Sequence, residues 1–570
     1  MTTALTSTFS NLFDPVRLFG PIFDKELRVS SRRKKNYFLR FAYILLLSIF
    51  ILSIWYSTLG IRSSGSAVYQ ISRLSSAGRQ IITTIVWFQF ITAQLIAIVM
   101  LSSSISDEIR TGTLSVLMTT PISSFQIVTG KLLSKLLQLM LLLAISLPLL
   151  AIVRVFGGVT WNYVVSSICI TLTAVMLAGA LSLFFSIIYR HSYAVILMTI
   201  VGYLLIFGAL PGLFNLLAIK GMFIFNRNVT QSILALINPF VALAAENATL
   251  LQSGVPKFFS WPIHCLIMLA VTAVLIAVAV WRVRGAALVS TFSSTTKLWP
   301  AGVLERMLTR IFYKAGSQSP DSSIIPVTGP PIVWKEMRKG FVGHSKTDRT
   351  MTILLIVLFC LTAILLLLSP RNNIFPRYLM FGLYLIIMIR IAVFSAGSIA
   401  GEKEARTWPI LLVTTLGDKE IIRGKAIAAI RRNIPLLLLY LVLMCISYAN
   451  LGIRVFTEIL IIFSIAALSV VCSLLFVVGC GIYFGVRLKT ATSAIAATVG
   501  SYIALTYILC GMFNPLRIVF YSAIYRAAPN YSFIIKLLSF AMSIIPTFAL
   551  GGIGIFLERR AVRRLRRDIF

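Results

Sequence analysis

Two polar segments carry the same kinds of side chain in the same order, and their charged and hydroxyl groups suit binding to a partner. The first, residues 107–131, reads DEIRTGTLSVLMTTPISSFQIVTGK, and the second, residues 402–425, reads EKEARTWPILLVTTLGDKEIIRGK. We call them the first and second islands, because each stands between two long apolar runs. Both contain Glu-x-Arg-Thr, then Thr-Thr and finally Gly-Lys.

This ordered repeat indicates a constraint that acts on both islands. The matched residues are Glu108 with Glu404, Arg110 with Arg406, Thr111 with Thr407, Thr119 with Thr414, Thr120 with Thr415, Gly130 with Gly424 and Lys131 with Lys425. A loop that only joins two spans needs a few polar residues, so an ordinary charged loop explains the repeat poorly. In this matching, one residue is missing from the second island between its first and second threonine positions.

Each island has the signals of a short helix with an apolar side. In the first, Thr111 or Thr113 can cap a helix. Leu114, Leu117 and Met118 then share one face at spacing i, i+3 and i+4.

The second island follows the same pattern, with Thr407 as a cap and Ile410 and Val413 on one face. Thr120 and Pro121 of the first island can cap and begin a further helix, because proline is favoured at a first helical position. We expect both islands to present a short helix with an exposed apolar side on the cytoplasmic side, once per half. Two such helices would suit two sockets on a two-fold soluble partner.

Residues for catalysis or metal binding are sparse. The three histidines are isolated, and the seven cysteines lie in or beside apolar runs with no pair at metal-ligand spacing. Residues 397–403, GSIAGEK, contain glycines but do not complete the phosphate-binding pattern GxxxxGK[ST]. The sequence predicts no catalytic residue and no metal site, so the chain is not expected to be an enzyme by itself.

The composition predicts a polytopic membrane protein. Of the 570 residues, 58% are hydrophobic and only 12% are charged, about half the charge of a soluble domain. Apolar runs of about 20 residues can cross a hydrocarbon core of roughly 30 Å as helices. We therefore expect an all-α protein.

The order of these runs predicts about 12 transmembrane helices in two parallel six-helix halves. The runs lie at residues 41–60, 81–105, 132–153, 163–188, 193–214, 263–281, 351–369, 378–400, 434–451, 458–484, 491–513 and 534–556. Residues 1–284 would form the first half, residues 285–328 a cytoplasmic linker, and residues 329–570 the second half.

A basic amphipathic segment precedes the first run of each half. GPIFDKELR at residues 20–28 resembles GPPIVWKEMR at residues 329–338. The shared charged residues are Lys25, Glu26 and Arg28 in the first half and Lys335, Glu336 and Arg338 in the second. Apolar residues at helical spacing predict a helix in the membrane interface in each half.

The net charge of +35 at pH 7 fits basic residues at the cytoplasmic ends of spans. It predicts contact with membrane lipid and places both termini in the cytoplasm. No basic patch with interleaved aromatic residues points to nucleic acid. Within the spans, Arg390 and its rough counterpart Gln94 are candidates for a translocation path, because intramembrane polar groups often serve function.

The order Glu-x-Arg-x-Gly-Thr-Leu, Thr-Pro-Ile-Ser and Gly-Lys in the first island resembles ATP-binding-cassette permeases of the type-two exporter family. The resemblance extends over nearly the whole chain. It implies that each island is the coupling helix between the second and third spans, and that two separate ATPase subunits, identical or different, dock there. ATP and magnesium would be bound by those subunits and not by this chain.

The resemblance also implies outward movement of a substrate across a prokaryotic cytoplasmic membrane. The sequence does not identify the substrate: a mostly apolar interface fits a hydrophobic or lipid-linked molecule, and also a polysaccharide or a peptide. Two other classes stay open. One is a stand-alone channel or secondary carrier, which would call for several mid-membrane charges that this sequence lacks. The other is a membrane anchor or scaffold subunit of a larger machine.

Overall fold

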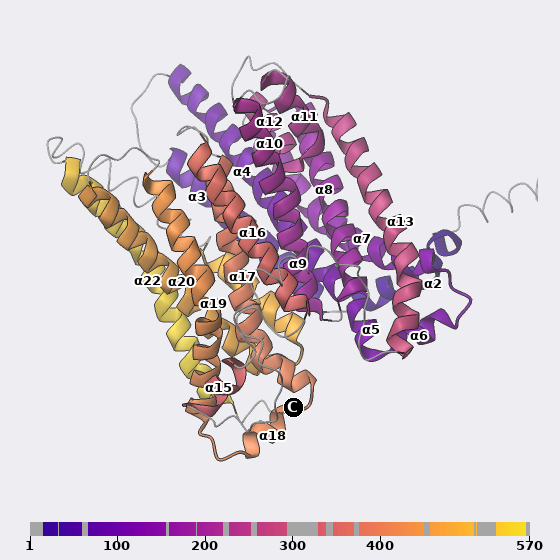
Figure 1. The fold of residues 1–570 in the computed structure, drawn as a ribbon. Coiled ribbons are helices and arrows are strands. Elements are labelled where there is room, and N and C mark those ends of the chain that lie inside the picture. Colours follow the sequence, from indigo (N-terminus) through magenta and orange to yellow (C-terminus); the bar gives the residue numbers. More distant parts are fainter. Residues whose placement is uncertain are drawn as a thin grey trace, which may run out of the picture.

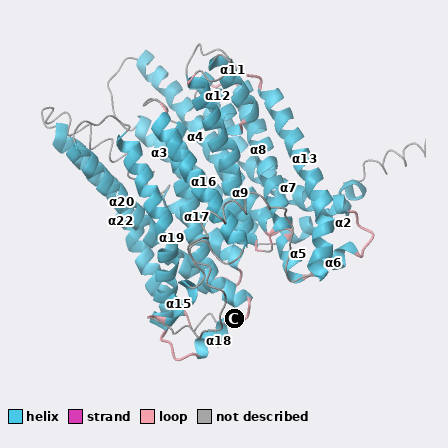
Figure 2. Ribbon diagram, viewed as in Figure 1, coloured by secondary structure: helices cyan, strands magenta, loops and turns pink. Residues whose placement is uncertain are grey.

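The computed structural model describes residues 15–31, 34–59, 67–155, 159–189, 191–220, 227–251, 259–292, 329–337, 346–369, 375–449, 456–506, 509 and 532–565. Within these ranges every regular element is a helix, which confirms the predicted all-α class (Figure 2). Helices satisfy their own backbone hydrogen bonds, so they are the form that long apolar runs adopt in lipid.

The N-terminal half begins with an amphipathic helix and continues with long apolar helices. Its elements are α2 (Pro15–Ser31), α3 (Lys34–Leu59), α4 (Ala67–Ser102), α5 (Ser106–Thr111), α6 (Thr113–Met118), α7 (Ser124–Val155), α8 (Trp161–Ile188), α9 (Ser192–Leu204), the π-helix η1 (Leu205–Ala209), α10 (Leu210–Ile219), α11 (Arg227–Ile237), α12 (Pro239–Leu251) and α13 (Trp261–Phe292). Because α13 continues to Phe292, the first residues of the predicted linker are helical; residues 293–328 lie outside the described ranges.

The C-terminal half has a similar order of elements. They are α15 (Pro331–Met337), α16 (Lys346–Leu368), α17 (Phe375–Glu404), α18 (Trp408–Val413), α19 (Asp418–Ala449), α20 (Phe456–Arg487), the apolar helix Ala491–Thr506 and α22 (Ser532–Arg564). Figure 1 shows α5, α6, α15 and α18 at one end of the molecule and α11 and α12 at the opposite end.

Nine helical segments among the described residues are long and apolar enough to cross a membrane, or ten if a bent pair is counted. The bent pair is Val229–Ile237 with Pro239–Leu251, at 117°. These segments make the protein a polytopic membrane protein. The number of about 12 stays a prediction; three of the predicted spans fall in α3, Ala491–Thr506 and α22, which are not among the nine.

The fifth apolar segment, α9–η1–α10, connects the two halves. It packs against α16 and α17 of the C-terminal half. Gly208 and Gly212 allow this approach, because a Cβ atom there would lie 2.8 Å from Leu379 and 2.4 Å from Phe375. The carbonyl of Phe207, inside the π-helix, accepts a hydrogen bond of 2.6 Å from Asn238 at the corner of the bent pair.

Candidate functional site

The first island folds as two short helices joined by a glycine. α5 ends at Thr111, Gly112 has φ of 73°, and α6 begins at Thr113. This left-handed conformation suits glycine, which has no Cβ to clash. The predicted threonine cap is wrong: Gly112 holds the cap position, and the Thr111 hydroxyl donates back to the carbonyl of Asp107 at 2.9 Å.

The apolar side of α6 faces the protein more than predicted. Leu114 is fully buried, because α6 packs against α13 and the side chain enters the core of α4, α7 and α8. Leu117 and Met118 are half-buried, and Val116 is 65% exposed. The expectation that Leu114 belongs to an exposed face is therefore wrong; Val116, together with Phe125 of α7, is the exposed apolar pair.

The helix after the first island starts later than predicted. Ser123 and Gln126 form a reciprocal capping box, with both hydrogen bonds at 3.2 Å, and α7 begins at Ser124. Thr120 does not cap it; its hydroxyl donates to the carbonyl of Leu117 at 2.6 Å, and Pro121 lies exposed in the turn.

The second island presents its apolar side more fully. Ile410 is 69% exposed and Val413 is 86% exposed, while Trp408 at the start of α18 is buried. Thr407 holds the cap position without a capping hydrogen bond from its side chain, which donates to the carbonyl of Glu402 at 3.3 Å. The residue before it, Arg406, has φ of 55°.

A buried lysine anchors the first island to the third apolar segment. Lys131 of α7 contacts Glu108 at 2.5 Å and donates to the carbonyl of Ser104 at 2.5 Å. Its charge is out of water and is stabilised by these two partners. Glu108 thus points inward, to the base of the island.

The second island has the same anchor. Lys425 of α19 contacts Glu402 at 3.0 Å and donates to the carbonyl of Ser398 at 2.7 Å. In both halves the lysine and the carbonyl are 27 residues apart. The Gly-Lys ends of the two islands are therefore structural anchors.

These contacts correct the matching of the islands. Lys131 and Lys425 are 294 residues apart, the spacing that also separates Arg110 from Glu404. At this spacing Glu108 corresponds to Glu402 and not to Glu404. The left-handed residues Gly112 and Arg406 then correspond as well, and the gap between the islands disappears. In this corrected matching, the Glu-x-Arg-Thr motif of the second island lies two positions further along the chain than that of the first.

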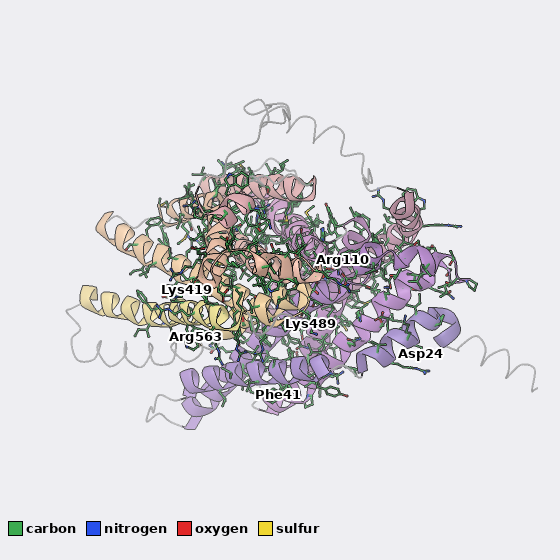
Figure 3. All side chains as sticks on the ribbon, turned by 90° about the horizontal axis from the view of Figure 1, so that it is seen from below. Asp24, Phe41, Arg110, Lys419, Lys489 and Arg563 are labelled. Atoms are coloured by element: carbon green, nitrogen blue, oxygen red, sulfur yellow. The ribbon has the colours of Figure 1, made fainter. Side chains whose placement is uncertain are left out.

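Glu404 has a different role from Glu108. One of its carboxylate oxygens accepts from Arg110 of the first island at 2.7 Å, and the other accepts from the backbone N–H of Ala491 at 2.8 Å. Figure 3, viewed from the end that carries the islands, shows Arg110 where the helices of the two halves meet.

The amphipathic helices α2 and α15 also contact the third apolar segment of their own half. Glu26 binds Lys135 of α7 at 3.0 Å, and Glu336 lies 4.0 Å from Lys425 of α19. Three other predicted residues lie near the surface: Lys25 is exposed, Arg28 pairs with Asp24, and Lys335 lies 3.5 Å from Glu402. The prediction for Arg338 lies outside the described residues. Both helices thus brace the helix that carries the anchor lysine.

The two candidates for a translocation path are buried in separate helices. Gln94 of α4 is 4% exposed and Arg390 of α17 is 1% exposed. Arg390 donates to Thr352 at 3.3 Å and lies 5.4 Å from the ring of Phe394. The same ring lies 4.2 Å from Arg432 of α19, a residue that sequence reasoning missed because it adjoins a basic helix end.

Among the residues that the structure describes, no group of three or more histidine, cysteine, aspartate or glutamate side chains could hold a metal ion.

Comparison with known families gives one match. The family model described as ABC-2 family transporter protein matches residues 20–284. A comparison with curated proteins finds no match to the chain. The matched residues include the amphipathic helix, the first island and the segments through α13.

Proposed function

Residues 20–284 belong to the ABC-2 transporter family, and from this premise we propose that the chain is the membrane permease of an ATP-binding-cassette exporter. The proposal extends the matched family to residues 329–570, as a second permease unit. The repeated lysine anchors and the common spacing of 294 residues support this extension.

One observation carries the proposal: each half holds a rigidly anchored island with exposed apolar side chains at the same end of the molecule. Val116 and Phe125 are exposed in the first half, and Ile410 and Val413 in the second. Surface apolar groups gathered beside polar residues suit a protein partner. The buried lysines would transmit a force on the island directly to α7 and α19.

In the proposed mechanism, two ATPase subunits bind ATP and magnesium, dimerise, and move the islands relative to each other. In this proposal the nucleotide is bound by those subunits and not by this chain. The movement changes the packing of α9–η1–α10 against α16 and α17. This contact is apolar, which favours a hydrophobic or lipid-linked substrate that moves outward through the membrane.

The proposal places the islands, α2 and α15 on the cytoplasmic side of a prokaryotic cytoplasmic membrane, with both termini on that side. Basic residues at the ends of α13 and α22 support this orientation through the positive-inside rule.

Purification of the tagged chain from its native membrane tests the proposal. We expect an ATP-binding-cassette ATPase to accompany the chain. Val116→Asp and Val413→Asp should each release that ATPase, because a charge cannot enter an apolar socket without loss of hydration. Val229→Asp, at an exposed site of α11 at the opposite end of the molecule, is the matched control and should retain it (Figure 1). Purification without any ATPase from unmodified membranes would refute the proposal and favour a scaffold or carrier.

A further inference from the structure

The ion pair between Arg110 and Glu404 joins the two islands across the two halves. The distance is 2.7 Å, and the residues are 294 positions apart. The anchor lysines have this same spacing, so Arg110 and Glu404 occupy equivalent positions in the two halves. A residue that contacts its own counterpart lies beside the two-fold axis of a symmetric pair. The pair therefore marks the axis that relates the halves.

The charges at these equivalent positions are opposite. Two identical halves would bring two arginines or two glutamates together at the axis, and like charges repel. The observed combination lets the N-terminal half pair with the C-terminal half and disfavours pairing of either half with a second copy of itself.

The pair continues on both sides to the fifth apolar segments. Asp107 lies 3.7 Å from Arg110 and accepts a hydrogen bond of 3.2 Å from Ser192, the first residue of α9. Glu404 accepts from the backbone N–H of Ala491, at the start of the helix Ala491–Thr506. A line of polar contacts thus connects the starts of the two fifth segments.

The exposure of the pair indicates that it can open. The side chain of Arg110 is 39% exposed, whereas those of the anchor lysines Lys131 and Lys425 are 4% and 1% exposed. The glutamates of the three pairs are alike, with Glu404 at 19%, Glu108 at 23% and Glu402 at 18% exposed. Partly exposed ion pairs are screened by water and salt and contribute little net stability. The anchor ion pairs are therefore expected to stay closed, and the Arg110–Glu404 ion pair is expected to open and close.

We propose that Arg110–Glu404 is a lock that holds the cytoplasmic ends of the two fifth segments together and must open during each transport cycle. The lock closes the cytoplasmic entrance between the halves in the state seen here. Its opening lets the fifth segments separate and admits the substrate. This last step rests on the proposed exporter function; the pairing of unlike halves does not.

The first experiment uses the chain alone in membrane vesicles. Arg110→Glu and Glu404→Arg each place like charges at the axis and should lower the thermal unfolding temperature. The double exchange should recover part of the loss, because Asp107 and the Ala491 N–H still favour the original arrangement. Arg563→Glu is the matched control and should have no effect. The variant R110C/E404C should be joined by a thiol-reactive cross-linker about as long as the two lost side chains, detected after protease cleavage in the linker. Failure of the exchange to restore any stability, or absence of the cross-link, would overturn the inference.

The second experiment uses the complex with its ATPase. Cross-linking of R110C/E404C with a thiol-reactive reagent that contains an internal disulfide should lower ATP hydrolysis about tenfold, a change of about 1.4 kcal/mol in activation free energy, and reductant should restore it. Each single cysteine variant should be insensitive to the reagent. Full hydrolysis by the completely cross-linked chain would show a static contact and overturn the lock. Absence of any co-purified ATPase would instead refute the proposed function and leave the first experiment intact.

Discussion

The two islands share an anchor and differ in nearly everything that they present. Each is held by a buried lysine on a glutamate and on a carbonyl 27 residues away. The exposed polar residues of the first island are mainly hydroxyl side chains and its buried apolar residue is Leu114, whereas those of the second are mainly charged and its buried residue is Trp408. The difference indicates that both islands must be attached to the membrane helices in the same way, while their exposed surfaces can differ.

Removal of an anchor lysine should have the largest effect. Lys425→Met leaves Glu402 without its buried partner and should lower the free energy of unfolding by about 3–5 kcal/mol. Lys131→Met should have an effect of similar size, because its side chain is buried to nearly the same extent. Thermal unfolding of the purified chain measures both, and Lys419→Met on the exposed side of α19 is the control. Equal stability of K425M and K419M would show that the anchor is not structural.

Truncation of the buried apolar residue compares how each island is packed. Trp408→Ala should destabilise by about 3–5 kcal/mol and Leu114→Ala by about 2–5 kcal/mol, since each leaves a cavity under its short helix. Protease sensitivity of the islands in membranes and thermal unfolding should report the same order. A larger loss for Leu114→Ala would mean that the first island depends more on its core contact.

Substitution of the residue with left-handed backbone conformation in each island should have the smallest effect on stability. Gly112→Ala adds a Cβ at φ of 73° and should destabilise by about 1 kcal/mol, whereas Arg406→Gly at φ of 55° should stabilise by a similar amount. Opposite signs in the unfolding temperature would confirm that the turns are equivalent. Because no heavy atom lies within 4 Å of a Cβ added at Gly112, crowding cannot account for the loss.

Much of this organisation could be predicted from the sequence, because apolar runs and ordered motifs are local signals. The membrane class, the helices and the exposed side chains Ile410 and Val413 follow from such signals. The burial of Leu114 does not, because it depends on α13, far along the chain. The sequence of a six-residue helix shows that it has an apolar side, but only the packing around it determines whether that side faces the protein or the solvent.

The matching of the motifs failed for a similar reason. Matching by residue identity paired Glu108 with Glu404. The local structure differs, because α4 ends at Ser102 and a separate helix, α5, follows, whereas α17 continues unbroken to Glu404. The contacts of Lys131 and Lys425 reveal the spatial match, and no local pattern contains them. The cross-half pair of Arg110 and Glu404 was likewise beyond the sequence, since each residue was expected to contact an ATPase.

The π-helix in the fifth segment has a consequence for the register of that segment. A π-turn holds one residue more than an α-turn, so the helix beyond it is rotated by about 100° relative to an uninterrupted one. That rotation sets which side of α10 carries Gly212 toward Phe375. Conversion of Leu205–Ala209 to a regular α-helix without loss of a residue would turn this glycine away from Phe375, whereas conversion with deletion of one residue would keep it in place. The one extra residue of the π-turn thus determines which face of α10 packs against the C-terminal half.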